Sequence, residues 1–140
     1  MAFTGNYSCN TLRSGLANGT INLSTDTFYL ALYTNAATLD ETTTAYTTTG
    51  EASGGNYSAG GQVVTATVSS EATASGSVVY VTFSNPSWTG QITARGALIY
   101  KAGANGAVCV LDFGNDKTSS SRFTVQMPAN TATSALIRLV

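Results

Sequence analysis

Hydrophobic and polar residues alternate with a period of two along most of this 140-residue chain, a pattern typical of β-strands. The segments TFYLALYT (27–34) and AVCVLDF (107–113) are apolar on both faces, so we expect each to be a strand that is covered on both sides. One-sided alternation predicts further strands at QVVTATVS (62–69), SVVYVTFS (77–84), ITARGALIYK (92–101), RFTVQM (122–127) and SALIRLV (134–140). In the first of these, Val64, Ala66 and Val68 are expected to point toward the core.

The segments between these strands carry the Gly, Pro, Asn and Asp residues that turns require. They are SNPSWTG (84–90), KAGANGA (101–107), FGNDKTSSS (113–121) and PANTAT (128–133). Short strands with polar connections predict an all-β fold: a single-domain antiparallel β-sandwich or jelly roll over residues 1–140. No second domain and no internal repeat are visible in the sequence.

One short helix is expected near the N-terminus, in SCNTLRSGLANG (8–19). Its apolar residues recur at i, i+3 and i+7, which places them on one face of a helix. Ser8 is expected to cap the start of this helix, and Gly19 is expected to end it.

A long connection, residues 35–62, separates two of the expected strands and contains the Thr- and Gly-rich stretch DETTTAYTTTGEASGGNYSAGGQ (40–62). Connections of this length are normally functional or disordered. The stretch holds little to bury, so two interpretations stay open: a surface loop without a partner, or an arm that becomes ordered against a partner. We also expect one turn of helix in TLDETTTAY (38–46), with Thr38 as its cap.

Aromatic residues in segments expected to be loops either cover the core or contact a partner. For Trp88 the role of a lid over the core is favoured, whereas Tyr46 and Tyr57 are favoured as contacts. Glycines in the long loop would allow an adaptable contact. The candidate partner-contact residues are therefore Tyr7, Tyr46, Gly54, Gly55, Asn56, Tyr57 and Trp88.

Charge excludes several classes of partner. The chain has six basic and seven acidic residues and a formal net charge of −1. Nucleic-acid binding requires clustered Lys and Arg, and surface binding to a membrane requires a basic face, so neither partner is expected. The N-terminus lacks the features of a signal peptide, and no segment is long enough to cross a membrane as an apolar helix.

Residues suited to catalysis are nearly absent, so we expect no enzyme, no cofactor and no metal site. Without His there is no Ser–His or Cys–His pair and no imidazole ligand. Cys9 and Cys109 match no zinc spacing, and they are expected to be reduced and buried, with a disulfide as the alternative. Asp112 and Asp116 are expected to cap a turn, although a cation between them stays open.

The acidic residues of the long loop are further candidates for catalytic groups. Asp40, Glu41 and Glu51 would have to provide two carboxylates in opposed environments, as sugar hydrolysis requires. A Thr- and Gly-rich loop is a poor place for such a rigid cleft, so this chemistry is not expected.

Several blocks together resemble a group of small proteins encoded by tailed bacteriophages. They are TFYLALYTNAATLDETTTAYTTTGEASGGNYSAGGQ, ITARGALIYK, AVCVLDFG, FTVQMPA and ALIRLV, and they span nearly the whole chain. The resemblance implies a virion structural protein. Among such proteins, the size and all-β character are most similar to capsid decoration proteins, also called cement proteins. The resemblance brings no catalytic or cofactor residues.

This resemblance implies a location and partners. The protein would be made in the bacterial host cytoplasm and would lie on the capsid surface of the virion. There it would bridge major capsid protein subunits and associate with itself as a homo-oligomer, either a dimer or a trimer. Residues 1–7 and segment 40–62 of the long loop would be arms that reach across neighbouring subunits. The alternative is a tail or fibre-associated structural module that binds a host glycan, with Tyr57, Asn85 and Trp88 as the candidate contacts.

Overall fold

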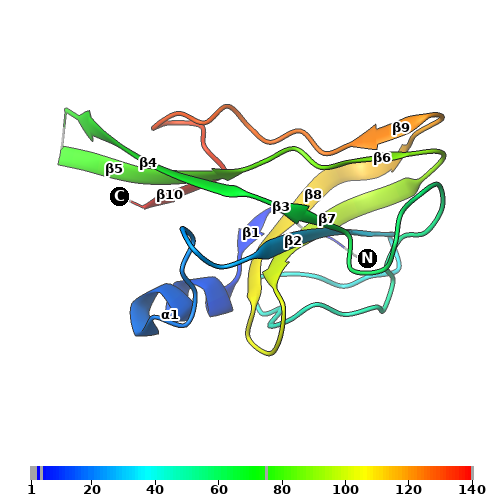
Figure 1. Ribbon diagram of the computed structural model, residues 1–140, viewed down its shortest axis with the longest axis horizontal. Coiled ribbons are helices and arrows are strands. Elements are labelled where there is room, and N and C mark those ends of the chain that lie inside the picture. Colours follow the sequence, from blue (N-terminus) through cyan, green and yellow to red (C-terminus); the bar gives the residue numbers. More distant parts are fainter. Residues whose placement is uncertain (1–2, 4, 75, 140) are drawn as a thin grey trace.

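The computed structural model describes residues 3, 5–74 and 76–139, and these form antiparallel sheets with one short helix (Figure 1). The expected all-β fold is therefore confirmed. The five-stranded sheet has, in spatial order, β1 (Tyr7–Ser8), β8 (Ala107–Thr118), β7 (Thr93–Lys101), β2 (Phe28–Tyr33) and β3 (Gln62–Val64). The three-stranded sheet has β10 (Ile137–Leu139), β5 (Gly76–Phe83) and β4 (Ala66–Thr73), and the two-stranded sheet pairs β6 (Ser87–Thr89) with β9 (Arg122–Thr124).

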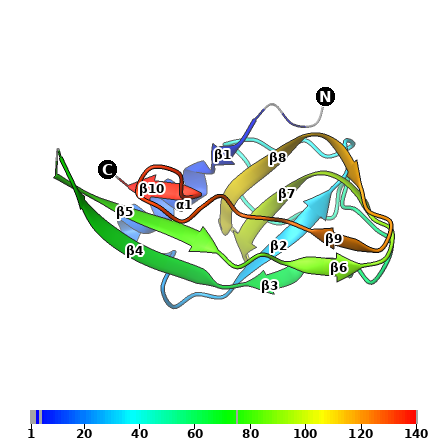
Figure 2. The same ribbon diagram turned by 90° about the horizontal axis from the view of Figure 1, so that it is seen from above.

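The two smaller sheets lie against one face of the five-stranded sheet (Figures 1 and 2). The chain passes from one sheet to another at short connections between consecutive strands. β3 pairs with β2 and ends at Val64; after Thr65 the same run of chain continues as β4, which pairs with β5. As a result, one continuous segment, Gln62–Thr73, forms an edge of both the five-stranded and the three-stranded sheet.

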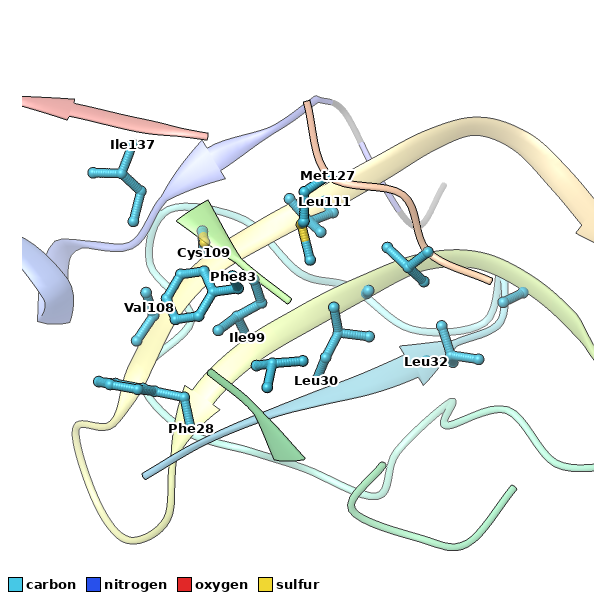
Figure 3. Close-up of a cluster of buried hydrophobic side chains, with 14 of the residues drawn as sticks. Phe28, Leu30, Leu32, Phe83, Ile99, Val108, Cys109, Leu111, Met127 and Ile137 are labelled. Atoms are coloured by element: carbon cyan, nitrogen blue, oxygen red, sulfur yellow. The ribbon is translucent and has the colours of Figure 1, made fainter. Parts of the chain in front are cut away.

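The main core lies between these layers (Figure 3). Leu30, Leu32 and Ile99 of the five-stranded sheet are fully buried there. Phe83 of β5 packs edge-on against Phe28 of β2, with ring centroids 5.6 Å apart. Such a pair adds about 0.5–1.5 kcal/mol beyond the burial of its surface.

A second buried cluster lies on the opposite face of the five-stranded sheet and includes Phe3, Cys9, Tyr33, Leu39 and Leu98. The long connection between β2 and β3 supplies part of its cover. Burial on both faces is the reason that β2 and the first part of β8, residues 107–111, lack simple alternation, and two-sided cover is confirmed for these two segments.

The expected helix is α1 (Asn10–Asn18). Gly19 ends it in the left-handed conformation, with φ of 83°, as expected. The predicted cap at Ser8 is wrong by one residue: Cys9 occupies the N-cap position and makes no side-chain capping bond. Instead, the Thr11 hydroxyl donates to the carbonyl oxygen of Ala107 at 2.6 Å, which ties the first turn to β8.

Three local predictions are wrong. Segment 84–90 was expected to be a turn but contains β6. Most of segment 113–121 belongs to β8, with a bulge that Gly114 allows at φ of 89°. Segment 38–46 contains no helix, because the Asp40 carboxylate accepts from the backbone N–H of Thr42 at 2.8 Å and holds a turn.

One expected inward residue is also exposed. Val64 is buried and Ala66 is half-buried, but 43% of Val68 is accessible to solvent. Most residues of β4 are exposed, because this strand extends away from the five-stranded sheet. Figure 1 shows β4 and β5 projecting together as a two-stranded ribbon away from the five-stranded sheet.

Candidate functional site

One carboxylate joins several parts of the long loop to one another. Glu51 Oε1 accepts a hydrogen bond from the hydroxyl of Tyr46 at 2.6 Å. Its Oε2 accepts from the hydroxyl of Tyr57 at 2.6 Å and from the backbone N–H of Gly60 at 2.8 Å. The loop also pairs with the end of β2, because the Ala52 N–H donates to the carbonyl of Leu32 at 2.9 Å. Glu51 thus joins distant parts of the loop at the edge of the sheet.

Two of the predicted contact residues, Tyr57 and Trp88, contact each other. Their ring centroids lie 5.4 Å apart, and the Tyr57 hydroxyl accepts the backbone N–H of Leu32 at 2.9 Å. Only 3% of Trp88 is exposed, and it belongs to the main core. Its prediction as a partner contact is wrong because β6 turns the indole inward, so the favoured reading of a core residue holds.

Gly54, Gly55 and Asn56 lie on the surface, and the backbone of this segment packs closely on the chain after β6. A Cβ atom at Gly55 would overlap the carbonyl oxygen of Thr89, so glycine allows the close approach. Asn56 donates its N–H to Thr89 at 2.9 Å and accepts the Thr89 N–H on Oδ1 at 2.8 Å. These predicted contact residues therefore make defined contacts inside the molecule.

As expected, segment 40–62 buries little within its own chain: Ala52 is its one buried residue, although Leu39 just before it is buried as well. Tyr33 of β2 donates its hydroxyl to the carbonyl of Thr47 at 2.6 Å, so the loop also satisfies a buried polar group of the sheet. The segment therefore contacts the five-stranded sheet through defined hydrogen bonds and covers part of one of its faces.

The described part of the expected N-terminal arm also docks on its own chain. Phe3 is 2% exposed and lies beneath the guanidinium of Arg95, whose Cζ is 5.6 Å from the ring centroid. Tyr7 is half-buried and pairs with Val110 through β1. Residues 1, 2 and 4 of this segment lie outside the described residues.

The tyrosines around Glu51 are suited to donating hydrogen bonds and not to acid–base chemistry. Burial raises the pKa of Tyr57 and of Tyr46, and the neighbouring Glu51 carboxylate raises both pKa values further. Burial also raises the pKa of Tyr100 to about 12. These hydroxyls stay protonated at neutral pH and stabilise the loop.

The other candidate chemical groups are Asp112, Asp116 and the two cysteines. Asp112 forms an ion pair with Arg95, and its carboxylate also accepts the backbone N–H of Gly114 at 2.8 Å. Asp116 is exposed on β8. Both Cys9 and Cys109 are free and buried, and burial raises the pKa of Cys9 to about 12. Among the described residues, no group of three or more His, Cys, Asp and Glu is placed to hold a metal ion.

A row of stacked tyrosines is one surface feature that sequence reasoning missed. Tyr29 of β2 and Tyr100 of β7 are cross-strand partners with ring centroids 5.6 Å apart, and Tyr46 stacks on Tyr100 at 4.9 Å. The row borders a hollow of about 390 Å³ that Ala45 and residues 102–104 complete. Tyr100 is 5% exposed and stacked on both other rings, so the half-buried Tyr29 and Tyr46 are the aromatic residues that the hollow offers to a ligand. The cross-strand register, which the sequence does not reveal, brings Tyr29 and Tyr100 together.

The second missed feature is the open edge of the molecule along β3 and β4. β4 has 8 residues, and among the described residues its one partner strand is β5, so its other side offers unpaired backbone groups. Val63 is 54% exposed and Val68 is 43% exposed, and both lie on this edge segment. Edges with unpaired N–H and C=O groups are surfaces onto which another strand can add. We call the segment Gln62–Thr73 the open edge.

Comparison with protein-family models, with curated proteins and with solved structures gave no match for this chain. Within the described ranges, no helix has the length and apolar character needed to cross a membrane. What the geometry offers is a well-packed β scaffold, with a tyrosine row on one face and an open edge along one side.

Proposed function

We propose that this chain is a structural protein of a tailed-bacteriophage virion that decorates the outside of the capsid. In this role it cements the shell by bridging major capsid protein subunits, and it also associates with copies of itself. It acts without catalysis, cofactor or metal, and it has no nucleic-acid or membrane partner. We further propose that the layered sheets are a variant of the β-sandwich, in which strands change sheet at Thr65 and after β5.

The observation that carries the proposal is the open edge. An exposed strand edge is a liability for a protein that works alone, and natural proteins usually shorten, charge or cover it. Here Glu71 is the only charged residue in the whole segment Gln62–Thr73, and Val63 and Val68 are exposed on it. Such an edge suits a subunit that is covered after assembly.

The low charge of the whole chain supports the same role. With a formal net charge of −1, the surface provides little electrostatic repulsion between copies. Many copies that each add a modest association energy stabilise a shell collectively, because binding of each copy shifts the shell toward the assembled state. The resemblance of the sequence blocks to small phage virion proteins is the reason for placing this subunit on a phage head.

The number of copies in purified virions tests this proposal. Quantitative mass spectrometry would compare this chain with the major capsid protein in the same particles. We expect hundreds of copies in a simple ratio to the capsid protein. Absence from the particle would overturn the proposed function and leave the fold unaffected.

A second candidate is a tail or fibre-associated module that binds a host glycan. Trp88 is buried and does not offer its indole to a glycan, whereas Asn85 is exposed, with its side-chain oxygen accepting the N–H of Met127 at 2.8 Å. The tyrosine row around Tyr100 is the observation that favours this candidate, because it borders an open hollow. A dozen copies or fewer per virion would favour the tail over the head.

A further inference from the structure

We propose that β4 pairs in an antiparallel manner with β4 of a second copy of this chain, so that two three-stranded sheets become one continuous sheet. This inference deepens the proposed function by naming the surface and the register through which copies associate. It concerns purified protein, so its failure would leave the location on the virion untouched.

The length of β4 distinguishes it from the other sheet edges. Among the described strands at sheet edges, β1 has 2 residues, and β3, β6, β9 and β10 have 3 each, whereas β4 has 8. Its pairing with β5 runs from Ala66 to Thr73 without a register shift, so no bulge twists the edge away. It contains no Pro and no Lys, the residues that commonly block edge pairing.

The hydrogen-bond pattern shows which backbone groups face outward. The Ser84 N–H donates to the carbonyl of Thr65 at 2.9 Å, so Thr65 belongs to the set of residues that bond toward β5. In an antiparallel ladder these residues alternate with residues that point away from the partner strand. The N–H and C=O groups that point away from β5 are therefore those of Ala66, Val68, Ser70 and Ala72.

One register of pairing between β4 and β4 of the second copy uses all of these outward-pointing N–H and C=O groups. If the two-fold axis passes beside Ser69, Val68 of one copy lies opposite Ser70 of the other, and Ala66 lies opposite Ala72. Every outward-pointing residue then faces an outward-pointing residue of the second copy, as hydrogen-bonded pairs require. An isologous contact of this type closes at a dimer and does not continue into a fibre.

The side chains that would lie opposite each other across the β4–β4 contact are compatible with this register. Glu71 lies opposite Thr67 of the second copy, so the two carboxylates do not face each other. On the other face, cross-strand rows join across the axis: Leu139, Val79 and Ser70 of one copy continue into Val68 of the other. Ser70, a small side chain, thus lies directly opposite Val68, and the apolar Val79 and Leu139 lie on the next two strands of the same row.

The position of β4 leaves room for this contact. Figure 2 shows β4 as the outermost strand of the projecting ribbon, with β5 and β10 behind it. The second copy would approach from the open side and would not meet the tyrosine row or the long loop, since those features belong to the five-stranded sheet and its outer cover.

Sedimentation velocity of the purified full chain tests the proposal. We expect a concentration-dependent dimer with twice the monomer mass of 14.4 kDa. Two variants at one exposed position test the register. Thr67→Lys places a cation opposite Glu71 of the second copy and should shift the equilibrium toward dimer. Thr67→Glu places two like charges opposite each other and should shift it toward monomer.

A third variant tests the backbone contact. Ser70→Pro removes an N–H that points away from β5, so the β4–β5 ladder keeps its bonds while the outer edge is blocked. Ser70→Ala, which keeps that N–H, is the matched control. We expect Ser70→Pro to be monomeric and Ser70→Ala to remain dimeric.

Two outcomes would overturn the inference. One is a wild-type chain that stays monomeric up to its solubility limit. The other is a dimer that responds equally to Thr67→Lys and Thr67→Glu. If Ser70→Pro fails to fold, as judged by circular dichroism, the two Thr67 variants decide, because neither changes the backbone.

Discussion

The long loop and the β4–β5 ribbon have opposite characters in sequence and in structure. Segment 40–62 is polar and rich in Thr and Gly, yet it is fastened to its own chain through Glu51, Tyr57 and backbone bonds to β2. The ribbon has the alternating pattern of an ordinary core strand, yet β4 is mostly exposed and one of its edges is unpaired. Composition alone therefore did not reveal which segment is bonded to its own chain and which one leaves a strand edge unpaired.

The physical reason lies in where each segment finds hydrogen-bond partners. A polar loop can be well ordered when its few carboxyl, hydroxyl and amide groups meet backbone groups of a sheet, because buried polar groups then stay satisfied. A strand is satisfied along both edges only when it has a neighbour on each side. Three substitutions, from the largest expected effect to the smallest, sharpen the contrast between the two regions.

Gly61→Ala should have the largest effect, because the backbone of Gly61, at the end of the loop, packs closely against the backbone of Leu30 in β2. Gly61 has φ of +81°, and a Cβ atom there would overlap the carbonyl oxygen of Leu30. We expect the free energy of unfolding to fall by about 3–5 kcal/mol, from left-handed backbone strain and overpacking together. Urea denaturation at neutral pH would measure this loss.

Gly19→Ala is the matched control, because Gly19 has nearly the same φ, +83°, with no atom within 4 Å of the added Cβ. It should cost about 1–2 kcal/mol, the strain alone. Equal losses in the two variants would mean that close packing of the loop on β2 does not stabilise the protein.

Glu51→Ala should have the next largest effect. It leaves the hydroxyls of Tyr46 and Tyr57 without their acceptor, and it removes the bond to the Gly60 N–H. Hydrogen bonds to a charged group contribute about 1.5–3 kcal/mol each, and these are partly exposed, so we expect a total loss of about 2–4 kcal/mol. Thermal and urea unfolding would measure it.

Glu41→Ala is the control for this variant, because it removes the same charge from the same loop. The Glu41 backbone carbonyl accepts the Asn10 N–H at 2.8 Å, and the substitution leaves that bond in place. Its effect should stay within about 0.5 kcal/mol. If Glu51→Ala lowered the free energy of unfolding by no more than Glu41→Ala does, the hydrogen bonds of Glu51 would contribute little to the stability of the protein.

Val68→Thr should have the smallest effect, provided that it is measured on dilute monomer. Val68 and Val81 are cross-strand partners, but Val68 is 43% exposed whereas Val81 is fully buried. We expect a change within about 0.5 kcal/mol for Val68→Thr. The same change at Val81 should cost about 1–3 kcal/mol, because it buries a hydroxyl. Equal costs at the two positions would mean that β4 is covered in the monomer.

Much of the secondary structure could be predicted from local pattern. The strands around Phe28, Val81, Leu98 and Val108 follow from periodicity, and the end of α1 follows from Gly19. The errors arose where tertiary contacts override local signals. The turn residues of segment 84–90 surround a buried Trp88, and the bulge at Gly114 lets β8 continue through a segment rich in Gly, Asn and Asp.

The candidate site was predicted less well than the fold. Tyr46 and Tyr57 were predicted to contact a partner; in the structure both donate to Glu51 of the same loop, and their contact with a partner stays a prediction. Tyr29 and Tyr100 were missed, because their stacking depends on the register between β2 and β7. Residues 71 apart in the sequence become neighbours only through that pairing (100 − 29).

The sequence by itself determined that this chain is an all-β protein with two-sided strands, one short helix and a surface of low charge. These properties follow from the order and type of residues along short windows, which local physics can interpret. Only the tertiary structure decided that the polar loop closes on its own sheet and that β4 remains open. Whether a strand edge is covered depends on which distant segments pack beside it, and no local pattern carries that information.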